Sequence, residues 1–307
     1  MDMTPSSGRT GLSRGARGMW LGLLGVALFG LTLPMTRLAT GTADAPQLSP
    51  WFVTFGRAVL AGVLSAATLW FTRAPLPTRA QWKPLGLALL GNAIGYPLLL
   101  GSALRIVPSG HAAVVTALLP LATAVAAAVL LRQRARPAFW VCAVAGSLLV
   151  VAFMLLRSGG GVRGAGAADL LLLGAVLAAA VGYVAGAQLT PALGAERVIC
   201  WVCVAALPIT VPGMLWTWPG TPVSAAAWGG FVYVGLFSMW IGFFAWFRGL
   251  ALGGALRVSQ TQLLQPFFSI AAALPLLGEP IEPATLGFAL AVVATVLAGR
   301  RLSAPRA

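Results

Sequence analysis

One arginine stands well inside a long apolar stretch of the sequence. In a helix that begins near Pro50, Arg57 would lie about 10 Å from the helix end. A charged side chain is costly inside lipid unless it faces a cavity or a partner. A guanidinium there can hold a substrate carboxylate through two parallel hydrogen bonds. Alternatively, Arg57 is structural, binding nearby backbone carbonyls or extending its charged end to the interface, and both interpretations remain open.

A second polar pair lies in the third apolar stretch. Asn92 and Tyr96 are spaced by one helical turn, so both side chains would project from the same face. Pro97 follows them, and a proline kink would expose backbone carbonyls to a cavity. We therefore predict that Asn92 and Tyr96 contribute to a substrate-binding site.

The ninth apolar stretch is the most polar of all. Ser259 and Gln262 would share one helix face, and Gln265 lies close by, just before a proline. Thr116 occupies the position equivalent to Gln262 in the first half of the chain. We predict that these four side chains line a cavity, although amides also hydrogen-bond between packed helices.

Two further stretches offer weaker candidates. Tyr183 and Gln188 in the sixth, and Trp240 and Trp246 in the eighth, would line the same cavity if their faces turn inward. For the aromatic residues, packing against lipid or neighbouring helices is the competing interpretation.

The acidic residues are placed away from the centres of the apolar stretches. All six fall in the tail, in loops or at the ends of spans: Asp2, Asp44, Asp169, Glu196, Glu279 and Glu282. A carrier of organic cations would use a buried carboxylate as counter-charge, and many proton-driven carriers use one as a relay. The sequence therefore favours a neutral or zwitterionic substrate that carries a carboxylate.

Histidine and cysteine suggest no metal or redox site. His111 is the single histidine and is expected at the interface, at the start of the fourth apolar stretch. Cys200 and Cys203 form one CxxC without a second pair, so both are interpreted as small core residues. We expect no metal, no cofactor and no catalytic residue.

The elements that must position these side chains are transmembrane helices. Apolar residues make up 59% of the chain and charged residues 8%, and the mean hydropathy is +0.91. A soluble domain carries roughly 25% charged residues, so the solvent of this chain must be lipid. We predict an all-α integral membrane protein with ten transmembrane helices, over 19–39, 51–71, 83–104, 109–131, 138–156, 168–188, 198–216, 228–249, 256–277 and 284–299.

The distribution of positive charge predicts the orientation. With the N-terminus in the cytoplasm, the outside holds only Arg37, Arg105, Arg157 and Arg163 of the 20 lysines and arginines, as the positive-inside rule expects. The net charge of +14 thus belongs to short cytoplasmic loops and does not indicate a nucleic-acid partner. We expect a cytoplasmic N-terminal tail (1–18), a first five-helix half (19–156), a linker (157–167), a second half (168–300) and a cytoplasmic C-terminal tail (301–307).

Two segments of the chain resemble each other at an offset of 146 residues. Residues 110–137 and 256–283 align so that Pro120 matches Pro266 and Pro137 matches Pro283. Five helices per half is an odd number, so the second half would enter the membrane with the opposite orientation. Inverted repeats of this kind are typical of secondary transporters, with the substrate site near the midplane. The alternative is that any two apolar, proline-containing helices look alike.

The repeated segment resembles the drug/metabolite transporter superfamily, in particular its ten-helix EamA-type permeases. Their pattern of a proline, a leucine–glycine–glutamate end and a glycine-rich last helix is met at Pro266, Leu277-Gly278-Glu279 and Gly287. The first copy has Pro120 but departs from the glycine–glutamate signature.

The first two spans add to this resemblance. Phe29-Gly30 followed by Arg37 is similar to the first-helix pattern of the family, and Arg57 also suits it. The resemblance implies a ten-helix bundle that moves a small organic solute by alternating access. Members handle amino acids, sugars, nucleotide derivatives and drugs, so it does not identify the substrate.

We therefore expect a secondary transporter in the cytoplasmic membrane, with both termini inside. An amino acid or similar carboxylate-bearing solute is the expected substrate, with export favoured, and the protein would act as a monomer or homodimer. A multidrug or quaternary-cation exporter of the same fold is the alternative. A membrane enzyme or a channel is less consistent with the sequence, which shows no cluster of catalytic residues, no Walker A pattern and no filter loop.

Overall fold

The computed structural model describes residues 13–130, 137–157, 162–253 and 258–303, and these residues are almost all helical. They contain no β-strand, only an isolated bridge between Gly41 and Pro46. Seven helices are long and apolar enough to cross a membrane: Arg14–Thr40, Pro50–Phe71, Arg79–Leu104, Ser109–Leu130, Gly166–Leu193, Glu196–Trp216 and Ala225–Gly249. Three shorter apolar helices, Trp140–Phe153, Thr261–Leu277 and Pro283–Thr295, lie where the remaining spans were expected. The all-helical membrane class is confirmed, while the count of ten spans and their inverted arrangement stay predictions.

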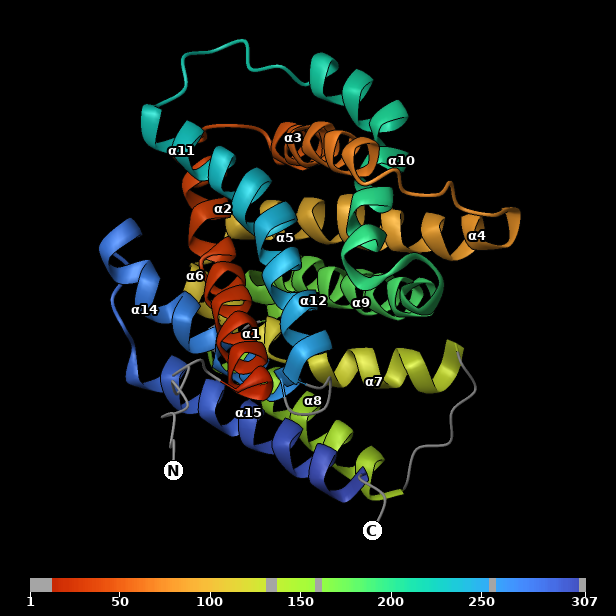
Figure 1. Cartoon of the computed structure of the whole chain (residues 1–307). Helices are drawn as coiled ribbons and strands as arrows, with labels where there is room; N and C mark the ends of the chain where they lie inside the picture. The colour runs from red at the N-terminus through yellow and green to blue at the C-terminus, as the bar shows by residue number, and fades with distance from the viewer. Residues whose placement is uncertain (1–12, 131–136, 158–161, 254–257, 304–307) are drawn as a thin grey trace, which may run out of the picture.

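Several of these stretches are divided into shorter helical elements. Those of the first half are α1 (Arg14–Gly30), α2 (Thr32–Thr40), α3 (Pro50–Phe71), α4 (Arg79–Ala88), η1 (Leu89–Gly95), α5 (Tyr96–Leu104), α6 (Ser109–Thr116), α7 (Leu119–Leu130) and α8 (Pro137–Arg157). Those of the second half are α9 (Val162–Leu193), α10 (Ala195–Trp216), α11 (Ala225–Tyr233), η2 (Val234–Ile241), α12 (Gly242–Gly253), η3 (Ser259–Leu264), α14 (Gln265–Leu277) and α15 (Pro283–Ser303). Figure 1 shows them gathered in one bundle.

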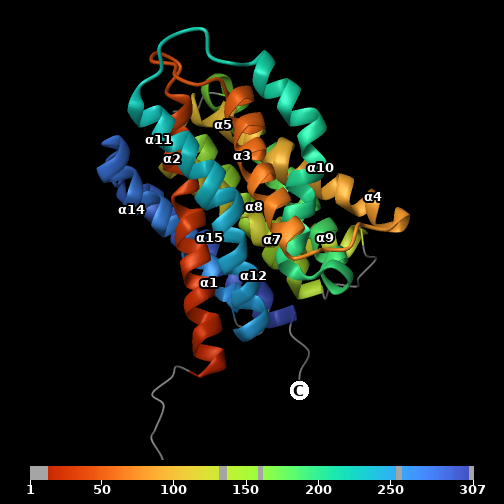
Figure 2. The ribbon, with the colours of Figure 1, turned by 45° about the horizontal axis from the view of Figure 1, so that its top comes forward.

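The bundle has two ends, which we name the near face and the far face. The near face is the end at which α1 begins and α15 ends; the far face is the opposite end, with the loop between α10 and α11 (Figure 2). The far face also holds the connections at residues 41–49, 105–108 and 278–282. Under the orientation predicted from the charges, the near face is cytoplasmic.

Local sequence signals fix where several helices begin and end. Ser49 caps α3 by accepting a hydrogen bond from the Phe52 N–H at 3.0 Å, and Pro50 takes the first turn, where no N–H is needed. Ser224 caps α11 in the same way, accepting from Ala227 N at 3.2 Å. Gly278 ends α14 with φ +68°, a left-handed conformation that suits glycine.

Small residues allow helices to approach closely in the bundle. α1 and α12 run side by side in both views (Figures 1 and 2). A Cβ on Gly249 of α12 would lie 2.7 Å from the backbone nitrogen of Gly22 on α1, so only glycine fits at this crossing. Close packing of this kind stabilises helix pairs in lipid, where the hydrophobic effect does not drive helices together. α3 packs on α10 and α8 packs on α15 in the same bundle.

Helix irregularities occur at equivalent places in the two halves. η1 and η2 are both π-helical. When the 146-residue offset found in the sequence is added to the bounds of η1, the result agrees with the bounds of η2 to within one residue. The same offset relates the break between α6 and α7, before Pro120, to the change from η3 to α14, before Pro266. Regular α-helix is thus interrupted near the middle of four spans, where backbone and side chains become available to a cavity.

Candidate substrate-binding site

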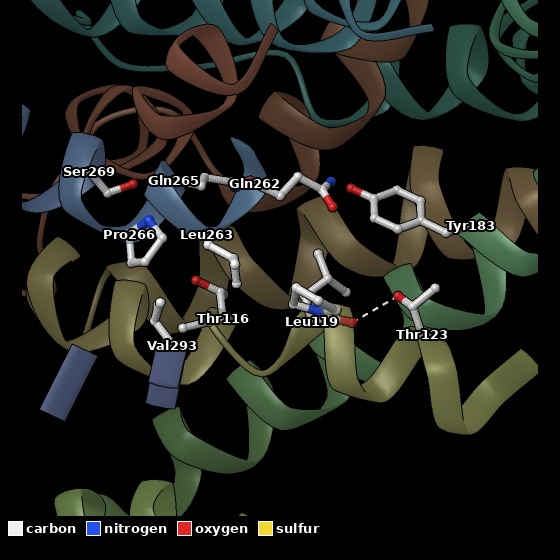
Figure 3. Close-up of a pocket in the computed structure, with 12 residues that line it drawn as sticks. Thr116, Leu119, Thr123, Tyr183, Gln262, Leu263, Gln265, Pro266, Ser269 and Val293 are labelled. Atoms are coloured by element: carbon white, nitrogen blue, oxygen red, sulfur yellow. Dashed lines mark hydrogen bonds between the residues drawn. The ribbon is translucent and has the colours of Figure 1, made fainter. Parts of the chain in front are cut away.

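Three adjoining cavities lie between the helices. The smallest, about 30 Å³, is lined by Phe29, Thr32, Arg57, Asn92, Tyr96, Tyr183, Ser238, Met239, Phe243 and Gln265. A second cavity of about 580 Å³ shares Phe29, Asn92, Tyr183 and Phe243 with it. A third, of about 100 Å³, adds Thr116, shares Gln262 with the second and shares Tyr183 and Gln265 with the first (Figure 3). Residues predicted separately from several spans therefore line three neighbouring cavities with shared walls.

Arg57 lies at this space as a deeply buried cation. Its side chain is 3% exposed, and α3 holds it in contact with η2. Nη2 donates to the Ser238 hydroxyl oxygen at 3.3 Å and to the Met239 sulfur at 3.6 Å, while Nε is buried without a hydrogen-bond partner. Among the described residues the salt bridges lie elsewhere, so no carboxylate of that part of the chain neutralises Arg57. The guanidinium keeps donor capacity for an anionic group that enters the cavity.

The two π-helices bring polar groups to the same cavity. Ser238 and Met239 belong to η2, and Asn92 belongs to η1. A π-turn shifts the side chains that follow it around the helix and disturbs the regular ladder of backbone hydrogen bonds. The Asn92 Oδ1 atom is buried without a hydrogen-bond partner. Like Arg57, Asn92 thus offers an unused polar atom at the cavity, which a substrate can satisfy.

The third cavity is lined from α6, α7, α9 and the ninth apolar stretch. Figure 3 shows the Tyr183 hydroxyl and the Gln262 amide directed toward each other, with Gln265 beside Gln262 on the side away from Tyr183. The hydroxyls of Thr116 and Thr123 donate to carbonyls of their own helices, Ala112 and Leu119, each at 2.8 Å. The two glutamines and the tyrosine are therefore the side chains with hydrogen-bonding capacity to offer here.

The largest cavity has a mainly apolar wall. Phe29, Phe243, Trp246 and Phe247 supply aromatic surface, and the cavity extends as far as Thr190, Pro191 and Val198 beside the Gly194 turn on the near face. It meets the smallest cavity at Asn92 and Tyr183. The combined space therefore has a polar end at Arg57 and an apolar section that leads toward the near face.

Three predicted residues are not brought into this space by the described structure. Gln188 is exposed on α9, because the residues of that helix that face the cavity are Tyr183, Gly186 and Ala187. Trp240 packs edge-on against Phe244, at a ring distance of 5.0 Å, beside the core cluster around Cys200 and Cys203. Ser259 lies in η3, and its side chain is outside the described residues.

Other lining residues were missed by the sequence reasoning. Thr32, Ser238 and Met239 surround Arg57, and the Thr32 and Ser238 hydroxyl oxygens lie 2.8 Å apart. Phe29 and Phe243 contact each other edge-on at 5.1 Å and line two of the cavities. Small hydroxyls and single aromatics are common in membrane helices, so only their contact with Arg57 or with each other distinguishes them.

The far end of the bundle is closed by an ion pair between the two halves. Arg37 Nε lies 2.8 Å from Glu279 Oε1, and the Arg37 Nη1 also donates to the carbonyls of Leu104 and Val107. Glu279 Oε2 accepts from the backbone N–H of Ser109 at 2.8 Å. Burial raises the pKa of the Glu279 carboxyl, while the neighbouring Arg37 acts in the opposite direction. Two residues singled out by the family resemblance are thus each other's partner.

The interfacial depth expected for His111 and the span-end position expected for Asp169 stay predictions, and the structure adds a contact between the two residues. Both side chains are buried, 5% exposed, and His111 Nε2 lies 2.6 Å from Asp169 Oδ1. α6 packs against α9, which brings the two together, and the Phe153 ring lies 5.0 Å from the imidazole. A buried carboxylate is therefore present after all, although it does not line the three cavities described above.

The cysteines behave as small core residues. Cys200 and Cys203 are buried without a disulfide in the cluster that also holds Leu189 and Met239. Within the described ranges, no group of three or more histidine, cysteine or acidic side chains is placed to hold a metal ion. The Arg57 guanidinium, with its unpaired Nε at the smallest cavity, has hydrogen-bonding capacity for an anionic group.

Comparisons with known proteins identify the family and the fold of the chain. The EamA-like transporter family matches the chain twice, over residues 16–156 and 166–299. A protein of Bacillus subtilis (strain 168) named "Uncharacterized transporter YdeK" is 40% identical over 287 residues, which cover 92% of this chain and 97% of that protein. A solved crystal structure superposes with a TM-score of 0.64 at 19% identity, over 95% of this chain and 100% of the other, a likeness that shows the fold alone.

Proposed function

The chain belongs to the EamA-like transporter family, and from this premise we propose that it moves a small carboxylate-bearing solute across the cytoplasmic membrane. The solute is neutral or zwitterionic overall, with an amino acid as the main candidate. Transport, rather than catalysis, is the activity of the family. The observation that carries the proposal is the buried Arg57, which has no carboxylate partner among the described residues and an unused donor at the cavity.

The polar groups around Arg57 suit the rest of such a solute. A carboxylate would bind the guanidinium in a two-pronged manner. Asn92, Gln265 and the Tyr183 hydroxyl lie around the same space and supply acceptors for an ammonium group. The solute's apolar body would occupy the section lined by Phe29, Phe243 and Trp246.

The closed far face suggests how the carrier operates. The ion pair of Arg37 and Glu279 joins α2 to the end of α14 on that side, while the largest cavity extends toward the near face. We assign this conformation to the state that loads from the near face. With the near face cytoplasmic, alternation between this state and one open at the far face exports the solute.

An organic cation is the competing substrate. Aromatic walls attract cations through the faces of their rings, and the largest cavity has such walls. The charge of Arg57 opposes a cation at the adjoining polar end, because like charges repel strongly where water is excluded. The carboxylate is therefore preferred.

Counterflow with purified protein in liposomes tests this proposal. Vesicles are loaded with individual amino acids, other carboxylates or quaternary amines, and the uptake of the same labelled compound is followed. Saturable exchange of a carboxylate-bearing compound, lost in Arg57→Gln and kept in Arg248→Gln, is the expected result; Arg248 is an exposed arginine on α12 and serves as the matched control. Exchange of quaternary amines alone would overturn the proposed substrate class.

A further inference from the structure

A groove lies on the outside of the bundle, where the near-face ends of α3 and α10 pack together. In Figure 1 the two helices run next to each other at the edge of the bundle. The groove has a volume of about 520 Å³ and shares no lining residue with the three cavities near Arg57. Binding of the transported solute at Arg57 therefore does not account for it.

The groove has an apolar wall that faces the membrane. Leu69 of α3 and Val204 of α10 line it, and the side chain of Trp70 beside them is 82% exposed. An exposed tryptophan on a membrane-spanning helix prefers the interface between hydrocarbon and headgroups. Since α3 ends at Phe71, the groove lies at the depth where lipid headgroups meet their acyl chains.

Arg73 supplies positive charge at the near-face end of the groove. It follows the last turn of α3, is exposed and lines the groove. The salt bridges of the described residues involve Arg37 and His111, so no carboxylate in that part of the chain neutralises Arg73. Arg197 lies on α10 one helical turn before Trp201 and on the same helix face. Guanidinium groups bind phosphate through paired hydrogen bonds.

Trp201 adds an unused hydrogen-bond donor to the wall of the groove. Its side chain is 9% exposed, and its indole Nε1 is buried without a hydrogen-bond partner. An indole N–H can only donate, and a buried donor without a partner is uncommon in a folded protein. The phosphate and ester oxygens of a phospholipid are acceptors, and the membrane supplies them at this depth.

The charges around the groove suit an anion. Residues 72–83 and 195–197, at the near-face ends of α3, α4 and α10, carry one acidic residue, Glu196, against four basic ones: Arg73, Arg79, Lys83 and Arg197. Basic pockets between transmembrane helices on the cytoplasmic side bind anionic lipid headgroups. The orientation predicted from the charges places the near face on that side.

We propose that this groove binds one anionic phospholipid. Arg73 and Arg197 hold the headgroup phosphate, and the Trp201 N–H donates to a phosphate or ester oxygen. An acyl chain packs on Leu69 and Val204. A zwitterionic lipid also carries a phosphate, but its cationic group is repelled by the arginines, so a lipid with a net negative charge is preferred. The site is independent of the solute that binds at Arg57.

The turn at the end of α3 offers a variant that removes the arginine and keeps the fold. Arg73 has φ +45°, a left-handed conformation that suits glycine. The backbone N–H groups of Arg73 and Ala74 donate to the carbonyls of Trp70 and Leu69 at 3.1 and 3.0 Å, and a glycine makes the same bonds. The unfolding temperature of Arg73→Gly in neutral detergent should therefore equal or exceed that of the wild type.

Native mass spectrometry of the purified full chain tests the proposal. The protein is titrated in neutral detergent with phosphatidylglycerol, which is anionic, or with phosphatidylcholine, which is zwitterionic, and the bound lipids are counted. We expect one phosphatidylglycerol to bind at least about tenfold more tightly than phosphatidylcholine, as a charge-assisted contact predicts. Phosphatidylglycerol should also raise the unfolding temperature of the wild type, because a ligand of the native state stabilises it.

Variants separate the groove from general attraction to the near face. Arg73→Gly is expected to weaken phosphatidylglycerol binding at least about tenfold. Trp201→Phe keeps an aromatic ring without the N–H and should weaken it by about 3- to 10-fold. Arg248→Gln, at an exposed arginine on α12 outside the groove, should bind the lipid like the wild type.

Four results would overturn the proposal. They are equal affinity for the two lipids, wild-type binding of phosphatidylglycerol in Arg73→Gly, displacement of the lipid by an equal concentration of inorganic phosphate, and a dimer that binds no lipid. Displacement by phosphate would indicate a site for a free anion, and a lipid-free dimer would indicate that a second copy of the chain fills the groove. None of these measurements involves transport, so their failure leaves the proposed function to be judged by counterflow.

Discussion

At the scale of residues, the chain offers three glutamines that differ in their surroundings. Gln262 and Gln265 line the cavities, whereas Gln188 is exposed on α9. We predict that Gln262→Ala and Gln265→Ala each raise the apparent KM for exchange by roughly 5- to 10-fold, since each removes a hydrogen bond worth about 1 kcal/mol. Gln188→Ala should match the wild type. Equal effects at all three positions would show that the glutamines act through stability and not through the solute.

A pair of glycines on α9 makes a second test at this scale. A Cβ on Gly182 would lie 2.5 Å from Asn92 Oδ1, so Gly182→Ala must displace the asparagine from the cavity. At Gly186 the nearest atom, in Val198, is at 3.6 Å, an ordinary contact. We expect at least tenfold slower exchange in Gly182→Ala and normal exchange in Gly186→Ala, at equal amounts of folded protein. Wild-type exchange in Gly182→Ala would remove Asn92 from the site.

Cavity-lining residues could be predicted from the sequence only where a polar side chain in an apolar helix is enough to place that side chain inside the bundle. Arg57, Asn92 and Gln265 are polar in apolar helices, and polar groups there turn inward because lipid cannot hydrogen-bond them. Gln188 satisfies the same condition, yet its place on the outward side of α9 depends on which neighbours that helix meets. The contact of Asp169 with His111 was not predicted, because the two residues lie on different helices and no spacing within the sequence links them.

At the scale of elements, Arg37 connects segments of both halves at the far face, and we propose that its contacts keep this face closed. One side chain binds Glu279 after α14 and the carbonyls of Leu104 and Val107 at the end of α5, two separate parts of the chain. We predict that Arg37→Gln lowers the free energy of unfolding by about 1–3 kcal/mol, as expected when a mostly buried charged partner is lost. We also expect that spin labels attached to Asp44→Cys and Ile281→Cys, measured by pulsed electron paramagnetic resonance, show a larger population of molecules with a longer distance across the far face. Arg248→Gln, at an exposed arginine, should change neither. A closed distance distribution in Arg37→Gln would mean that the ion pair does not hold the far face shut.

The elements themselves were largely predictable, and their irregularities were not. Runs of about 20 apolar residues identify the seven long helices, and Pro50 and Gly278 mark ends that the structure confirms. The π-helices η1 and η2 were not predicted, because an apolar run of span length does not distinguish a π-turn from regular α-helix. They nevertheless carry Asn92, Ser238 and Met239 to the cavity.

At the scale of the whole molecule, the charge distribution makes a prediction about orientation. The loop that holds Asp44 lies on the far face and the start of α4, with Ala80, on the near face; both residues are exposed. In a cysteine-free background we expect a membrane-impermeant maleimide to label Asp44→Cys in intact cells, and Ala80→Cys only after the cells are opened. The reverse pattern would place the near face outside and would turn the proposed export into uptake.

The central claim for the whole molecule is that the buried charge of Arg57 holds the carboxylate of the transported solute. The most direct measurement compares counterflow inhibition by the exchanged amino acid and by its amide, in which a neutral carboxamide of similar shape replaces the carboxylate. We predict that the wild type prefers the acid by at least about tenfold, in line with a charge-assisted hydrogen bond, and that Arg57→Gln abolishes this preference while Arg248→Gln keeps it. Equal inhibition by acid and amide in the wild type would contradict the account.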